Sequence, residues 1–153
     1  LVHSCSLDRA VVTYDLQTSR RCNYKMNRDG GFTGMCQRKD SEQELLTTSL
    51  DGFVLSWDCD VEHPVLTLDC GRRMKFTCIS LSASSRFVAV GCEDCCVRIW
   101  DLLAREIVAV CRGHSGNIAQ LAWAPDDKQV VSVGTDSAVC VWNFYLTGEA
   151  ATE

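Results

Sequence analysis

An aromatic residue followed by an acidic or amide residue recurs along this chain at a nearly constant interval. The aromatic residues stand at positions 14, 57, 100 and 142, so the successive steps are 43, 43 and 42 residues. An aspartate stands six residues before each of them, at Asp8, Asp51, Asp94 and Asp136. Chance does not easily give four copies of two features at one period, so the chain is interpreted as an array of repeats.

Each repeat reads as a series of short strands. In the third repeat, strands are predicted at 76–82, 87–92, 97–102 and 107–111, with turns at 83–85, 93–95 and 103–105. The run Phe87-Val88-Ala89-Val90 is continuously apolar. A sheet with one solvated face would alternate apolar and polar residues, so the inner strands are predicted to be covered on both faces by neighbouring sheets.

The last repeat carries the fullest set of marks. These are, in order, Gly113-His114, a predicted strand at 118–123, the turn Pro125-Asp126-Asp127, a strand at 130–133, Asp136 and Trp142. The pattern resembles the WD40 family closely, and the repeat length agrees with the ~40–45 residues of a WD40 blade. The resemblance covers essentially the whole chain. It implies an all-β fold, the WD40 β-propeller.

The resemblance also implies a structural role for certain polar residues. In the family a His, a Ser or Thr, the turn Asp and the Trp form a buried hydrogen-bonded tetrad. The matching residues here are His114, Ser132, Asp136 and Trp142. The other repeats keep only part of it, around the turn aspartates Asp8, Asp51 and Asp94. The first has Ser4 but Tyr14 for the Trp, the second has Thr47 and Trp57 but no evident His, and the third has Val90 for the hydroxyl.

The domain organisation follows from the repeats. We expect a propeller segment at 1–145, divided into a partial repeat at 1–26, repeats at 27–69 and 70–112, and a repeat at 113–145 without its outer strand, followed by a tail at 146–153. That makes about three complete blades and one incomplete blade. Because propellers close with ~4–8 blades, the chain is predicted to be the C-terminal part of a larger ring.

Composition narrows the class of function. The net charge of −5 argues against non-specific nucleic-acid binding. Eleven cysteines, an odd number scattered mostly in strand-like runs, favour free thiols in the cytoplasm over a disulfide framework. The sequence contains neither a signal peptide nor an apolar run of the ~20 residues needed to span a membrane. We therefore expect a cytoplasmic protein without a membrane partner.

Several residue sets could suggest chemistry, but each has a stronger structural interpretation. The turn aspartates recur with the repeat, which catalytic residues have no reason to do. His114, Ser132 and Asp136 have the residue types of a hydrolase triad but no nucleophile-elbow motif. Cys92 and Cys95 form a lone CxxC without the second pair of a zinc site. The acidic loop at 58–63 lacks the pattern of a calcium loop. No enzyme activity, cofactor, metal or small-molecule substrate is predicted.

The loops are predicted to divide between two rims of opposite charge. One rim holds the turn aspartates, His114 and the candidate partner-binding residues Arg9, Arg28, Arg72, Arg73, Lys75 and Arg112. The other holds Asp40, Glu42, Asp58, Asp60, Glu62, Asp126 and Asp127, together with Lys39, Arg105 and Lys128. The polarity has two interpretations. It serves solubility, or the basic rim docks an acidic protein surface, with Arg72 and Arg73 as the best candidates.

Two passages are similar to the closing repeats of cilia- and flagella-associated WD-repeat proteins. They run from Gly113 to Trp142 and from Gly30 to Asp60. This similarity implies a structural scaffold of the axoneme that contacts tubulin or other axonemal proteins. One alternative is a substrate receptor of a ubiquitin ligase, although the Arg that such receptors carry two places after the Trp-Asp pair is replaced by Asp60, Leu103 and Tyr145. A second alternative is a targeting module attached to an enzyme domain elsewhere.

Overall fold

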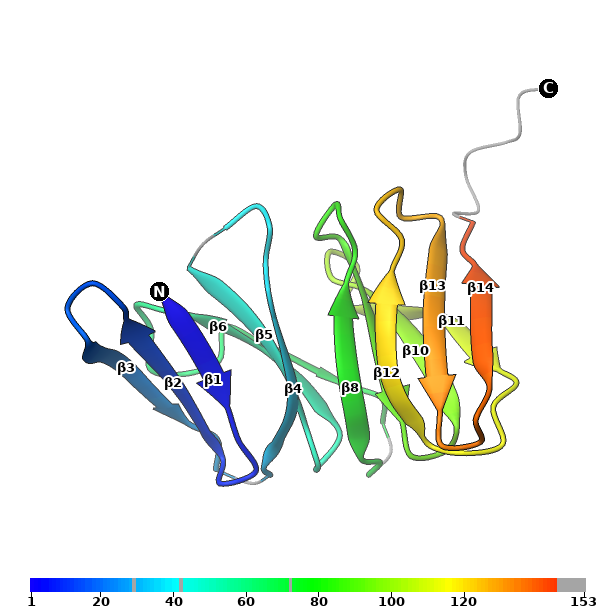
Figure 1. Ribbon diagram of the computed structural model, residues 1–153, viewed down its shortest axis with the longest axis horizontal. Helices are drawn as coiled ribbons and strands as arrows, with labels where there is room; N and C mark the ends of the chain where they lie inside the picture. Colours follow the sequence, from blue (N-terminus) through cyan, green and yellow to red (C-terminus); the bar gives the residue numbers. More distant parts are fainter. Residues whose placement is uncertain (29, 42, 72, 146–153) are drawn as a thin grey trace.

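Four antiparallel β-sheets stand side by side in the computed structural model (Figure 1), which describes residues 1–28, 30–41, 43–71 and 73–145. These residues form fourteen strands and no helix. Each strand pairs with the next one along the chain, so every sheet is a simple meander. The all-β prediction is thus confirmed, and the four sheets are called blades 1 to 4 below.

The blades contain three or four strands each. Blade 1 contains β1 (Val2–Cys5), β2 (Ala10–Asp15) and β3 (Arg20–Met26). Blade 2 contains β4 (Phe32–Gln37), β5 (Glu44–Ser49), β6 (Phe53–Asp58) and β7 (Leu66–Asp69). Blade 3 contains β8 (Phe76–Leu81), β9 (Phe87–Cys92), β10 (Cys96–Asp101) and β11 (Glu106–Arg112). Blade 4 contains β12 (Ile118–Trp123), β13 (Gln129–Gly134) and β14 (Val139–Asn143).

The blades are arranged as segments of a partial propeller. The first strands β4, β8 and β12 are neighbours, so they form the inner side of the array, and the later strands of each blade lie progressively further out. Blade 1 carries Tyr14 on β2, at the position that Trp57 holds on the third strand of blade 2. Its β1 therefore corresponds to a second strand. Blade 4 carries Trp142 on β14, which corresponds to a third strand.

The core consists of the seams between blades. Every residue of β9 and β10 is buried, which confirms that the middle strands are covered on both faces. Leu46 and Val54 of blade 2 share one apolar cluster with Val88 and Trp100 of blade 3. A second cluster joins blade 3 to blade 4. Burial on both faces explains the uninterrupted apolar runs in the sequence.

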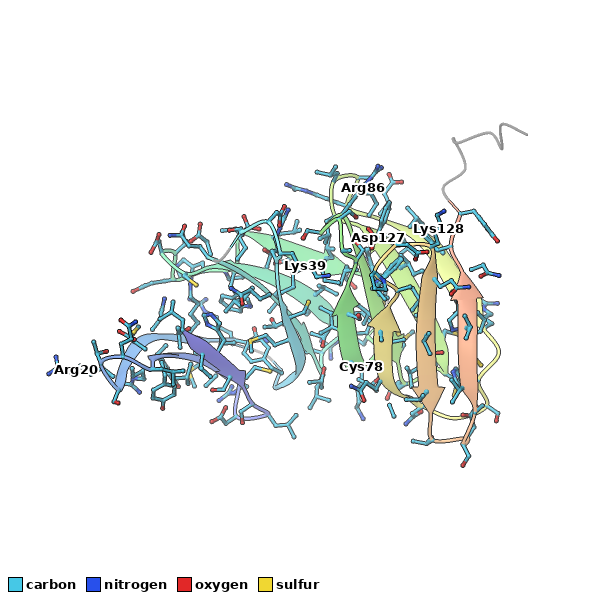
Figure 2. All side chains as sticks on the ribbon, turned by 45° about the horizontal axis from the view of Figure 1, so that its top comes forward. Arg20, Lys39, Cys78, Arg86, Asp127 and Lys128 are labelled. Carbon is cyan, nitrogen blue, oxygen red and sulfur yellow. The ribbon has the colours of Figure 1, made fainter. Side chains whose placement is uncertain are left out.

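Polar contacts also cross the seams. Figure 2 shows Asp127 of blade 4 at the same end of the molecule as Lys39, Arg86 and Lys128. Its carboxylate accepts hydrogen bonds from the backbone N–H groups of Ala83 and Ser84, the latter at 2.8 Å, in the β8–β9 turn of blade 3. Between blades 1 and 2, the buried Lys25 ammonium donates to the backbone carbonyls of Asp58, at the end of β6, and of Val61, in the loop that follows.

The repeated tryptophan of blades 2 and 3 packs on a phenylalanine of its own blade and also belongs to the apolar cluster at a seam. The Trp100 ring packs edge to face on Phe76, with ring centroids 5.7 Å apart, and Trp57 packs on Phe32 at 6.0 Å. Both tryptophans are 1% exposed, whereas Tyr14, at the same repeat position, is 45% exposed. The aromatic residue at this repeat position is therefore expected to contribute more to the free energy of unfolding in blades 2 and 3 than in blade 1.

We expect Trp100→Ala to lower the free energy of unfolding by about 3–5 kcal/mol, because it leaves a cavity between blades 2 and 3. Tyr14→Ala is the matched control, and its cost should stay under about 1 kcal/mol because the ring is half exposed. Urea unfolding followed by circular dichroism measures both. Equal costs for the two variants would contradict the assignment of the core to the seams.

Candidate functional site: the rim of repeated turns

One rim of the molecule carries the turns between the second and third strands of every blade. These turns lie along the lower side of Figure 1. In each, the residue after the turn aspartate has a positive φ: Arg9 at 73°, Gly52 at 89°, Cys95 at 64° and Ser137 at 63°. Three of the aspartates accept a hydrogen bond from the backbone N–H two residues on, at Ala10, Cys96 and Ala138. A short side chain that bonds its own backbone stabilises this left-handed turn.

In blade 4 the four residues matched to the tetrad form one continuous hydrogen-bonded chain. The Trp142 Nε1–H donates to Ser132 Oγ at 2.8 Å. Ser132 Oγ lies 2.8 Å from His114 Nε2, and His114 Nδ1 lies 3.0 Å from Asp136 Oδ2. If the His114 proton is on Nδ1, facing the carboxylate, then Nε2 accepts a hydrogen bond from the serine hydroxyl. Every polar side-chain atom along this hydrogen-bonded chain then has a partner. Ser132 is fully buried and beyond the reach of a substrate.

The Asp136 carboxylate holds the rim together at this blade. It also accepts hydrogen bonds from the N–H groups of Ser115 at 2.8 Å and Ala138 at 3.1 Å. These backbone bonds, Ser115 first, and the His114 ring lower the pKa of the Asp136 carboxyl to about 2. The ionised form is therefore the one that stabilises the fold.

Blade 3 neutralises its turn aspartate in a different way. Both oxygens of Asp94 accept hydrogen bonds from the Arg98 guanidinium, at 2.9 and 2.6 Å. Arg98 is a buried residue of β10, and its hydrogen bond is the main reason that the pKa of Asp94 is lowered. This pair was not predicted from the sequence. Its signal was an arginine inside an otherwise apolar strand, four residues after the turn aspartate.

Equivalent backbone bonds align the rim of the three last blades. Leu50 N–H donates to Gly31 O in blade 2, Glu93 to Lys75 in blade 3 and Thr135 to Asn117 in blade 4, all at 2.9–3.0 Å. His114 stands three residues before the last of these acceptors. By the same count, Arg28 takes the histidine position in blade 2 and Arg72 takes it in blade 3. Arg28 is exposed on the rim, and Arg72 lies outside the described residues.

Blade 2 holds only part of the hydrogen-bonded chain. Trp57 Nε1–H donates to Thr47 Oγ1 at 2.9 Å, as Trp142 does to Ser132. Both carboxylate oxygens of Asp51 are buried, yet neither has a hydrogen-bond partner among the described residues. The Phe53 N–H, which would match the donors of the other turns, bonds to Ser49 Oγ instead.

The candidate partner-binding residues are exposed on this rim. Within the described ranges they are Arg9, Arg28, Arg73, Lys75 and Arg112. Lys75 pairs with Glu93 at 3.8 Å, and the Arg9 guanidinium donates to the Arg28 carbonyl at 3.1 Å. The described residues give none of the four arginines an ion-pair partner. The rim also carries Asp69 and Glu93, two acids that were not predicted from the sequence to lie there. They line a cavity of about 760 Å³ with Arg73 and Lys75.

Many acids of the opposite rim are engaged within the protein. Asp40 pairs with Arg38 and Asp101 pairs with Arg86, both at 2.7 Å, and Asp127 accepts backbone N–H bonds across a seam. Asp58 accepts a hydrogen bond from the Asp60 N–H. Glu42 falls outside the described residues. Fewer free carboxylates therefore remain there than the sequence suggests.

The geometry of the thiols and carboxylates bears on metal and redox chemistry. In the described part of the chain, no three His, Cys, Asp or Glu side chains gather in a way that could hold a metal ion. Cys92 of the CxxC pair is fully buried, and burial raises the pKa of its thiol to about 12. A thiol that stays protonated is a poor nucleophile and a poor metal ligand.

The described residues also include no helix that could cross a bilayer.

The repeated meanders, the tryptophan seams and the tetrad define a class of protein, the WD40 β-propellers. The family profile "WD domain, G-beta repeat" matches residues 63–101 and 105–143, and the chain belongs to this family. WD40 repeats are protein-interaction modules, and that is the general function the family implies.

The chain is similar to proteins of several different assemblies. It is 25% identical to cilia- and flagella-associated protein 52 of Sus scrofa over 141 residues, which cover 92% of this chain and 22% of that protein. It is 37% identical to the retinoblastoma-binding protein 5 homolog of Drosophila melanogaster over 47% of the chain and 16% of that protein. A U3 snoRNP-associated protein-like sequence of Arabidopsis thaliana is 24% identical over 88% of the chain and 32% of that protein. The chain thus spans a third or less of these relatives.

Acid should weaken the fold through Asp136. A carboxyl whose pKa is lowered by folding contributes stability that is present above the unfolded pKa near 4 and is lost as the pH falls toward about 2. We expect Asp136→Asn to flatten this part of the curve of melting temperature against pH and to lower the melting temperature at pH 7. Ser137→Ala, beside it on the exposed side of the turn, is a control for local disturbance. An unchanged acid dependence in Asp136→Asn would contradict the role given to this carboxylate.

Proposed function

We propose that the chain is a non-enzymatic docking scaffold that binds an acidic protein surface through Arg9, Arg28, Arg73 and Arg112 on the turn rim. One observation carries the proposal. The arginines are exposed and without ion pairs among the described residues, while Asp8, Asp94 and Asp136 on the same rim already accept internal hydrogen bonds. The rim therefore presents free arginine donors, while three of its carboxylates are already engaged within the chain.

The charge pattern suits selective association. The chain as a whole carries a net charge of −5, so exposed arginines without ion pairs on the turn rim would orient an acidic partner toward that rim. At physiological salt, the attraction between exposed charges is largely screened beyond ~8 Å. Binding through the rim should therefore be fast and should weaken as salt increases. RNA is not among the proposed partners, because the net charge is negative and the cations are interspersed with Asp69 and Glu93.

We propose the axoneme as the site of this docking, with tubulin or another acidic axonemal protein as the partner. The relatives named cilia- and flagella-associated protein 52 match more than nine-tenths of the chain, which supports this choice. The similarity to a U3 snoRNP-associated protein-like sequence makes the nucleolus the main competing location. Fractionation of ciliated cells separates the two. Retention on demembranated axonemes supports the proposal, and a nucleolar or wholly soluble protein contradicts it.

Charge reversal on the rim should abolish most of the binding. We expect Arg9→Glu with Arg73→Glu to weaken co-sedimentation with polymerised tubulin by about tenfold or more, a loss of about 1.4 kcal/mol or more in binding free energy. Both side chains are exposed, so the fold should not change. Lys128→Glu, an equally exposed reversal on the opposite rim, is the matched control. Equal losses in the two proteins, or none in either, would contradict docking through the turn rim.

A further inference from the structure

Asp51 is the turn aspartate whose surroundings are incomplete. Its two carboxylate oxygens are buried and have no hydrogen-bond partner among the described residues. The neighbouring Gly30 lets the backbone lie directly against the carboxyl group, since a Cβ there would stand 2.3 Å from Asp51 Oδ1. A carboxylate withdrawn from water without a donor is unfavourable. Such a group is accounted for if a donor from outside the chain completes it.

The other blades show which kind of donor completes this turn. In blade 4 the partner of Asp136 is the imidazole of His114, and in blade 3 the partner of Asp94 is the guanidinium of Arg98. Both are planar groups with N–H donors. In blade 2 the first bond of the equivalent hydrogen-bonded chain is already in place, because Trp57 Nε1–H donates to Thr47 Oγ1 at 2.9 Å. The missing component is therefore a planar nitrogen donor beside Asp51.

A cavity of about 260 Å³ lies on this side of Asp51, between the end of blade 1 and blade 2. Its lining residues include the acids Asp51 and Glu62 and the apolar residues Phe53, Trp57 and Pro64. The volume is below the ~300–1,000 Å³ of sites for drug-sized molecules. A cavity of this size, lined by both acidic and apolar residues, is suited to a single long side chain.

We propose that this cavity binds the guanidinium group of an arginine from a partner protein, with Asp51 as its counter-ion. A guanidinium is planar, stacks on aromatic rings and can donate two parallel hydrogen bonds to one carboxylate. An ammonium has no flat face to place against the partly exposed ring of Phe53. The inference does not rest on the proposed docking of an acidic partner, although the two sites share Arg28, which is a rim arginine and also lines the cavity.

The direct test titrates the chain with N-acetyl-arginine methylamide and follows the Trp57 indole N–H by NMR. We expect a saturable shift of that signal, because Trp57 is one of the residues that line the cavity. N-acetyl-citrulline methylamide, which has the same shape without the charge, should bind at least tenfold more weakly. Asp51→Asn should remove the response, whereas Asp136→Asn should keep it. Equal responses to the two ligands, or a response that persists in Asp51→Asn, would overturn the proposal.

Stability of the empty chain gives a second, ligand-free test. Asp51→Asn removes an unpartnered buried charge, so its melting temperature should equal or exceed that of the parent, whereas that of Asp136→Asn should fall. A fall of the same size in both would show that Asp51 already has a partner, and the proposal would fail. Arg28 also lines the cavity. If the parent does not bind the arginine ligand but Arg28→Gln does, Arg28 occupies the cavity and no partner arginine is needed.

Discussion

The burial of both faces of the two middle blades is the constraint on which this structure depends. A sheet such as β8–β11, whose two middle strands are buried at every residue, has no face that it can leave in water. Stability therefore comes from the seams, where side chains of adjacent blades share one core. The period of the sequence follows from the same constraint, because each repeat must offer its neighbours the same kind of surface.

On top of this shared core, the rim differs from blade to blade. All four turns contain an aspartate followed by a left-handed residue, so the backbone repeats closely. The donors around the carboxylates do not repeat. Asp136 has a histidine, Asp94 has an arginine from the third strand, and Asp51 has no partner among the described residues. Because the seams already supply the core, the rim can vary in ways that suit binding.

The sequence was sufficient to predict the strands, since apolar runs and turn residues are local signals. The predicted strand at 87–92 coincides with β9, and those at 97–102 and 107–111 differ from β10 and β11 by one residue at each end. The rim was harder to predict, because its contacts depend on register. That Arg28 stands at the histidine position emerges only from the matched bonds of Leu50 and Thr135. Predicting the Arg98–Asp94 pair would have required knowing that the two side chains lie on the same side of the turn.

The bonds from Ala83 and Ser84 to Asp127 have a consequence for how the molecule opens. Their donors belong to blade 3 and their acceptor to blade 4, so these two N–H groups are protected only while the seam is closed. The amides of β9 and β10 are protected by pairing inside blade 3 and do not need the neighbour. Hydrogen exchange at the two turn amides would thus measure the separation of whole blades, apart from the unfolding of either one.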